Sequence, residues 1–241
     1  MENHAFPFKA VIFDMDGVIV DTEKFYFDTL AGLFDAAGID VPREALCSAV
    51  GASYQDFRKN LVSWYALGGE HISEDEGLAR YNAWEAKHEP DYAALLNPGV
   101  AETIAELKRR GIRVALASSS PMSNIREVLA ACGLSDAFEF LTSGEQFRQS
   151  KPNPEIYLYT LELLGLPADV CCCIEDSVPG IAAGKAAGLT VFAKREDRFG
   201  FSQGEADRII DSARRTRGSI ARAKSCTARC VVALGWPRLA G

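Results

Sequence analysis

The sequence of 241 residues lacks any apolar run that is long enough to cross a membrane. Its amino terminus also lacks the basic and apolar segments of a signal sequence. These two absences exclude a membrane-spanning helix and a membrane partner, and we expect a cytoplasmic protein. Disulfides are not expected either, because three of the seven cysteines, Cys171, Cys172 and Cys173, lie in a predicted buried strand where cysteine acts as a small hydrophobe.

Acidic residues are absent from residues 214–241, which hold seven basic residues. Since this basic tail contributes +7 to a net charge of −7, residues 1–213 carry −14. A basic segment can form a patch for nucleic acid or for a membrane surface. We instead expect a disordered or loosely docked extension, and no nucleic-acid partner.

What the sequence does contain is an apolar run at residues 10–13 that ends in Asp14-Met15-Asp16-Gly17-Val18. Such a run predicts a buried parallel strand, and open α/β sheets bind ligands at the carboxyl ends of their strands. The pair Asp14 and Asp16 therefore indicates an active site. Taken alone, the pair could equally be two solvated acids at an exposed strand end.

Two further motifs suit a phosphate group. The predicted strand 112–117 runs into Ser118 and Ser119 before a helix, whose free N–H groups and positive dipole end favour an anion. The alternative for Ser118 is the commoner one, a serine that caps a helix. Lys151 precedes Pro152, which restricts the lysine backbone and aims its ammonium. The alternative for Lys151 is a solvated surface lysine.

A fourth motif adds two acids, because the predicted strand 170–174 ends in Glu175-Asp176. If these strands are parallel neighbours, Glu175 and Asp176 approach the first acidic pair. Two unit charges about 4 Å apart repel by roughly 4 kcal/mol at an effective dielectric near 20. A divalent cation with oxygen ligands would relieve this repulsion, and Mg²⁺ fits a site with few carboxylates and a substrate phosphate. The alternative is an acid that stays protonated.

Together the four motifs resemble the haloacid dehalogenase superfamily, over about residues 9–212, and residues 13–23 are similar to its phosphatase and β-phosphoglucomutase branch. The resemblance implies that Asp14 attacks phosphorus and forms an aspartyl-phosphate, with Asp16 as general acid and base. It implies four Mg²⁺-site residues and three phosphate-binding residues. The former are Asp14, Asp16, Glu175 and Asp176, and the latter are Ser118, Ser119 and Lys151.

The resemblance favours a Mg²⁺-dependent phosphatase that acts on a small phosphorylated metabolite, with a sugar phosphate as the expected substrate. Asp16 separates it from dehalogenases, which do not keep an acid there. The first alternative is a β-phosphoglucomutase. The mutase histidine and arginine are replaced here by Tyr26 and Tyr54, although Arg58 or Lys59 could instead bind a second phosphate. These tyrosines could equally be packing residues. The second alternative is a non-catalytic binding module.

Strand and helix patterns alternate from residue 93 onward, which predicts an α/β protein with a doubly wound, Rossmann-like parallel sheet. Between the first two strands, helical patterns dominate and predict an inserted helical cap domain. We therefore expect a core domain of residues 1–20 and 93–213, a cap of residues 21–92, and a monomer. The predicted strands are 10–13, 112–117, 138–142, 170–174 and 190–193. The predicted helices are 23–37, 43–50, 54–65, 73–88, 100–110, 121–132, 155–164 and 178–187.

Overall fold

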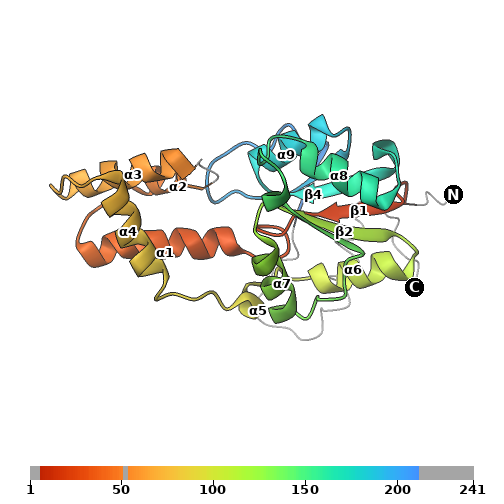
Figure 1. The fold of residues 1–241 in the computed structure, drawn as a ribbon, viewed down its shortest axis with the longest axis horizontal. Coiled ribbons are helices and arrows are strands. Elements are labelled where there is room, and N and C mark those ends of the chain that lie inside the picture. The colour runs from red at the N-terminus through yellow and green to blue at the C-terminus, as the bar shows by residue number, and fades with distance from the viewer. Residues whose placement is uncertain (1–5, 51–53, 212–241) are drawn as a thin grey trace. The chain divides into compact units, whose positions relative to one another are not determined.

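The computed structural model describes residues 6–50 and 54–211, and these form two compact units (Figure 1). The sheet unit comprises residues 6–20, 92–196 and 202–211, and the helical unit comprises 21–50, 54–91 and 197–201. The sequence places residues 197–201 in the core, whereas the structure assigns them to the helical unit. The basic tail predicted at 214–241 lies outside the described residues.

The sheet unit is built on six parallel strands in the order β3-β2-β1-β4-β5-β6. This order confirms the predicted fold class, and the strand that precedes Asp14 is central. Phe13 pairs with both Leu116 and Ile174, so the residues after these strands reach the same edge of the sheet. The strands are β1 Ala10–Phe13, β2 Arg113–Ser118, β3 Phe140–Ser143, β4 Cys171–Glu175, β5 Thr190–Lys194 and β6 Arg208–Ile210.

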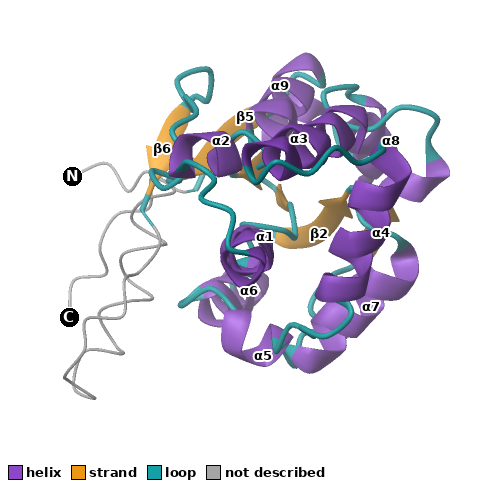
Figure 2. Cartoon of the chain, turned by 90° about the vertical axis from the view of Figure 1, so that its left-hand side faces the viewer, coloured by secondary structure: helices purple, strands orange, loops and turns teal. Residues whose placement is uncertain are grey.

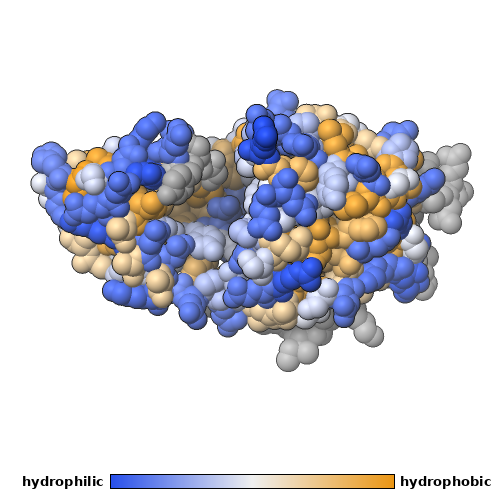
Figure 3. All heavy atoms as spheres, in the orientation of Figure 1, coloured by the Kyte–Doolittle hydropathy of each residue, from blue (hydrophilic) through white to orange (hydrophobic). Residues whose placement is uncertain are grey.

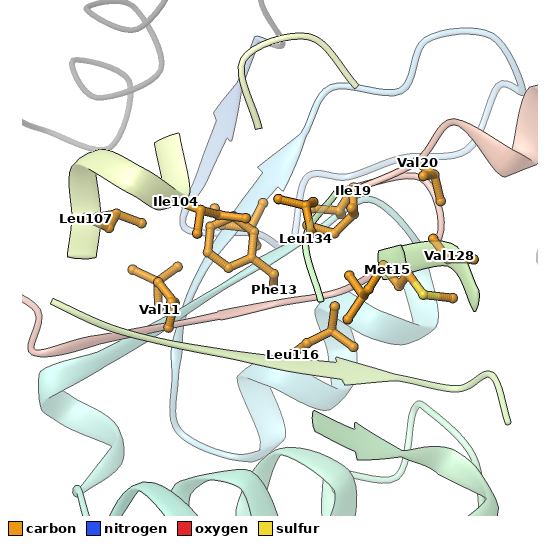
Figure 4. Packing of buried hydrophobic residues seen from close by; sticks show 14 of the residues in the cluster. Val11, Phe13, Met15, Ile19, Val20, Ile104, Leu107, Leu116, Val128 and Leu134 are labelled. Carbon is orange, nitrogen blue, oxygen red and sulfur yellow. The ribbon is translucent and has the colours of Figure 1, made fainter. Parts of the chain in front are cut away.

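Helices cover both faces of this sheet, with α6 and α7 on one side and α8 and α9 on the other (Figure 1 and Figure 2). Because side chains alternate along a strand, Phe13 joins the apolar cluster under α6 and α7, shown in Figure 4, while Ile12 joins the cluster under α8 and α9. The helices of this unit are α5 Tyr92–Leu95, α6 Val100–Arg109, α7 Met122–Ala131, α8 Glu155–Leu164 and α9 Val178–Ala186, with short 3₁₀ turns at Gly144–Gln146 and Ala168–Val170. The short helix α5 was not expected from the sequence.

The helical unit packs around its own aromatic cluster, in which the Phe34 ring contacts Trp64 and Tyr65. Its helices are α1 Thr22–Ala37, α2 Arg43–Cys47, α3 Tyr54–Leu67 and α4 Glu74–Glu85. All four were predicted, but α2 and α4 end three residues earlier than the sequence patterns indicate. Ser73 caps α4, since its hydroxyl accepts a hydrogen bond from the Glu76 N–H.

The surface carries mixed hydrophilic and hydrophobic residues on the face shown in Figure 3. In the part of the chain that the structure describes, none of the helices has both the length and the apolar character that crossing a bilayer requires.

Candidate active site

Asp14 directly follows β1, at the edge where the parallel strands end. Its backbone N–H donates to the Ile174 carbonyl at 3.0 Å, which extends the pairing with β4 by one residue. The residue is 7% exposed, and its Oδ1 accepts a hydrogen bond from Lys151 Nζ at 2.6 Å. Burial raises the pKa of Asp14, and the nearby Glu175 carboxylate raises it further, while Lys151 acts in the opposite direction. A positive charge next to Asp14 is therefore needed to keep it ionised.

The Lys151 ammonium lies between two carboxylates. It donates to Asp14 Oδ1 and Glu175 Oε1, each at 2.6 Å, and to the Ala117 carbonyl at 3.2 Å. Burial alone would lower the pKa of Lys151, but these two carboxylates outweigh burial and raise it. The charged Lys151 side chain is thus only 6% exposed, and the alternative of a solvated surface lysine is wrong.

The end of β4 supplies two further acids. The Glu175 side chain is fully buried, and its Oε2 accepts hydrogen bonds from the Asp176 N–H and the Ser177 hydroxyl, each at 3.3 Å. Carboxylate oxygens of Asp14, Glu175 and Asp176 all lie within 4.8 Å of one another. Since lone like charges at this spacing repel strongly, the group suits a cation.

The backbone next to this acidic group leaves room for Asp176 only because residue 17 is glycine. Gly17 has φ +75°, and a Cβ at this position would lie 1.7 Å from Asp176 Oδ2. The donor set contains only carboxylate oxygens, which are the ligands that Mg²⁺ prefers. The residues present therefore fit a Mg²⁺ ion held by Asp14 and Asp176 with Glu175 beside them.

Asp16 lies outside this acidic group and has a partner that sequence reasoning missed. The Ser120 hydroxyl donates to Asp16 Oδ2 at 2.9 Å, and the Ser120 carbonyl accepts from the Ser143 hydroxyl at 2.7 Å. Asn97 Nδ2 secures the turn after Asp16 by donating to the carbonyls of Gly17 and Val18, each at 3.0 Å. The run of three serines was visible in the sequence, but it did not show that the third serine reaches Asp16.

The two predicted phosphate-binding serines differ in exposure. Ser118 is fully buried at the end of β2, and its Oγ accepts a hydrogen bond from the Ser120 N–H at 3.1 Å. Ser119 is exposed, and its backbone lies so close to Gly144 that a Cβ there would be 2.9 Å from the Ser119 Cα atom. Ser118 ends β2 and Ser119 follows it in the turn before α7, and the role of both serines with phosphate stays a prediction.

The three cap residues are all in the helical unit. Tyr26 is 37% exposed and lines an open hollow of about 340 Å³ with Glu23, Phe27 and Phe57. Arg58 forms ion pairs with Glu74 and Asp75, so its guanidinium is engaged within the unit. Tyr54 begins α3, but its side chain, like residues 51–53, lies outside the described part of the structure.

Two further residues at the site were missed, because no local motif marks them. Tyr157 on α8 donates its hydroxyl to Glu175 Oε1, and burial raises the pKa of Tyr157, so the hydroxyl keeps its proton. Gln203 is buried, and its Nε2 donates to the carbonyls of Asp176 at 2.6 Å and Lys194 at 2.7 Å. Tyr157 thus contacts the carboxylate at the end of β4, and Gln203 contacts the backbone of the next residue.

Comparisons with known proteins find similarity over most of the chain. A family model described as haloacid dehalogenase-like hydrolase matches residues 8–188. Hexitol phosphatase B from Escherichia coli (strain K12) is 36% identical, over 74% of this chain and 79% of its own length. Beta-phosphoglucomutase from Bacillus subtilis is 33% identical, over 75% and 80%. The crystal structure of a HAD family hydrolase from Deinococcus radiodurans R1, with bound phosphate and sodium, has a TM-score of 0.69 at 25% identity and covers 92% of this chain and 99% of that one.

Proposed function

The chain belongs to the haloacid dehalogenase-like hydrolase family, and on that premise we propose that it is a Mg²⁺-dependent phosphatase that hydrolyses a small sugar phosphate through an aspartyl-phosphate on Asp14. The observation that carries this proposal is the pairing of a buried Asp14 with the Lys151 ammonium at 2.6 Å, beside an all-carboxylate group. The family resemblance itself is confirmed.

Asp14, Asp16 and Lys151 each have a separate role in the proposed reaction. An Asp14 carboxylate oxygen attacks phosphorus, the phosphorus–oxygen bond to the sugar breaks, and Asp16 gives its proton to the leaving alkoxide. Asp16 then takes a proton from water, which attacks the phosphorus of the aspartyl-phosphate and releases inorganic phosphate and Asp14. Lys151 and the amides after Ser118 offset the negative charge of the phosphoryl group. A bound Mg²⁺ would supply further positive charge at the phosphoryl oxygens.

A sugar phosphate is the substrate class that the relatives support, because one of them is named hexitol phosphatase B. The mutase keeps some support from the relative named beta-phosphoglucomutase. Against it stand Tyr26 in place of the mutase histidine and the engagement of Arg58 by two acids. Tyr26 and Tyr54 are proposed as substrate-reading residues of the cap. The monomeric state, the cytoplasmic location and the lack of a nucleic-acid partner stay predictions.

The test is phosphate release from a panel of sugar phosphates and other phosphomonoesters in the presence of Mg²⁺. We expect hydrolysis of at least one sugar phosphate, and Asp14→Asn should lower kcat by at least about a thousandfold, as removal of a nucleophile does. The matched control is Asp136→Asn, which changes an exposed aspartate and should retain activity. Absence of hydrolysis across the panel contradicts the proposal.

A separate assay addresses the mutase. With β-glucose 1-phosphate and a trace of the bisphosphate, formation of glucose 6-phosphate would establish the mutase. Release of inorganic phosphate alone would reject it.

A further inference from the structure

The position of the Lys151 ammonium depends on its hydrogen-bond acceptors. A lysine has three N–H donors, and in this structure they meet Asp14 Oδ1, Glu175 Oε1 and the Ala117 carbonyl. Two of these acceptors are carboxylates at the same distance of 2.6 Å, so Lys151 is shared between Asp14 and Glu175. A residue that weakens or strengthens the attraction between the Glu175 carboxylate and the ammonium therefore changes where the ammonium lies relative to Asp14.

Tyr157 is in contact with both members of this ion pair. Its hydroxyl donates to Oε1 of Glu175, which is the same oxygen that Lys151 contacts. Its ring centroid lies 5.1 Å from Lys151 Nζ, within the range of a cation–π interaction. One side chain thus contacts both groups: its hydroxyl binds the Glu175 carboxylate, and its aromatic ring lies near the Lys151 ammonium.

The fold fixes Tyr157 in this place. Tyr157 is fully buried, and it lies on the inner face of α8, whose buried residues are Ile156, Tyr157, Thr160, Leu161 and Leu164. Thr160, one turn later on α8, donates its hydroxyl to Thr142 Oγ1 of β3 at 2.9 Å and so ties the helix to the sheet. On the opposite side, the Glu175 carboxylate lies against Gly180, where a Cβ would be 2.0 Å from Oε2. Both partners of the hydrogen bond are therefore buried and closely packed.

The geometry points to Tyr157 as a positioning residue for Lys151: by donating to Glu175 Oε1, its hydroxyl offsets part of the negative charge there and leaves the ammonium available to Asp14 and to a phosphate group. This inference rests on the proposed phosphatase function, in which Lys151 holds the transferring phosphate. Without the hydroxyl, Lys151 is the remaining side-chain donor to Oε1 among the described residues, and the ammonium is drawn toward Glu175.

A purely structural role for Tyr157 is the competing explanation, since a buried tyrosine hydroxyl needs a hydrogen-bond partner in any case. The two explanations differ in what removal of the hydroxyl changes. If the hydroxyl only satisfies packing, its loss lowers stability and leaves phosphate binding as it was. If it positions Lys151, its loss weakens phosphate binding.

The experiment measures the affinity of the Mg²⁺-loaded full chain for inorganic phosphate by calorimetry, together with kcat and KM for the best sugar phosphate. Tyr157→Phe should weaken phosphate binding by about fivefold to tenfold, the usual net effect of one intramolecular hydrogen bond, and should raise KM more than it lowers kcat. Tyr157→Leu removes the ring as well and should weaken binding further.

The matched control is Tyr159→Phe, on the same helix. Tyr159 is 38% exposed, and its ring contact with Phe147 does not depend on the hydroxyl. We expect phosphate affinity and KM within twofold of the wild type. If Tyr157→Phe also stays within twofold and only its melting temperature falls, the positioning role is wrong.

The outcomes separate this inference from the proposed function. A wild type that binds phosphate but hydrolyses no phosphomonoester contradicts the phosphatase, while the Phe variants still decide the role of Tyr157. A wild type that binds no phosphate overturns both.

Discussion

At the scale of single residues, charge balance explains why the site needs a cation. Asp14, Glu175 and Asp176 bring three carboxylates within 4.8 Å of one another, and Lys151 offers one ammonium to two of them. When all are ionised, two negative charges are left, which a divalent ion can balance. Burial of Asp14 acts against its ionised form, so the proposed nucleophile depends on the Lys151 ammonium and on a bound cation to stay ionised.

Gly17 gives a prediction at this scale. Gly17→Ala places a Cβ against the Asp176 carboxylate and should push this ligand away, so we expect Mg²⁺ affinity to fall by about tenfold or more, as when the support of a metal ligand is removed. The measurement is the Mg²⁺ concentration that gives half-maximal phosphate release.

The matched control is Gly111→Ala, because Gly111 has the same φ of +75° and a Cβ there meets nothing within 4 Å. Both variants carry the backbone strain of about 1 kcal/mol, but only the first should change the Mg²⁺ requirement. An equal Mg²⁺ requirement in both variants contradicts this account of Gly17.

At the scale of elements, residues 197–201 are a segment of the second half of the chain that completes the helical unit. The Phe199 ring contacts the ring of Phe27 on α1, with 5.4 Å between the centroids. Arg198 forms a bidentate ion pair with Asp21, in which each guanidinium nitrogen lies 2.8 Å from a carboxylate oxygen. Phe199 is 7% exposed within the apolar cluster of this unit. The helical unit therefore depends on a segment that lies about 100 residues after its last helix.

Phe199→Ala tests this dependence. Loss of a buried phenylalanine should cost about 3 kcal/mol in the free energy of unfolding of the helical unit, measured by hydrogen exchange of the α1 amides under native conditions. Leu67→Ala is the control in the same unit, because Leu67 is 59% exposed and its truncation should change stability by less than about 0.5 kcal/mol. Equal protection of α1 in the two variants would show that the segment is dispensable.

At the scale of the whole molecule, two units with separate apolar clusters are expected to unfold in separate transitions. The acidic group lies entirely in the sheet unit. A ligand of this group therefore stabilises the sheet unit, because binding to the folded state alone shifts its unfolding equilibrium.

Mg²⁺ should accordingly raise the melting temperature of the transition that belongs to the sheet unit. At a hundredfold excess over its Kd the stabilisation is about 2.7 kcal/mol, or roughly 5–10 °C for a unit of this size. Differential scanning calorimetry with EDTA and with MgCl₂ measures the effect. Asp176→Asn should abolish it, whereas Glu127→Gln, which changes an exposed carboxylate on α7, should keep it. A shift that persists in Asp176→Asn would place the ion elsewhere.

The sequence by itself determined the fold class and the acids and lysine that meet at the sheet edge. Short apolar runs before Asp14, Ser118 and Glu175 are local patterns, and a parallel sheet brings the ends of its strands together whatever their separation in the chain. That is why the sequence alone predicts that Lys151, Asp14 and Glu175 lie in one site.

Only the tertiary structure decided which neighbours hold these groups. Tyr157 reaches Glu175, Ser120 reaches Asp16, and Gln203 reaches the Asp176 carbonyl across separations of 18 to 104 residues. The place of residues 197–201 in the helical unit was decided in the same way. A local pattern records whether a side chain is apolar or polar, but a hydrogen bond depends on where two distant backbones bring their atoms, and that is fixed by packing alone.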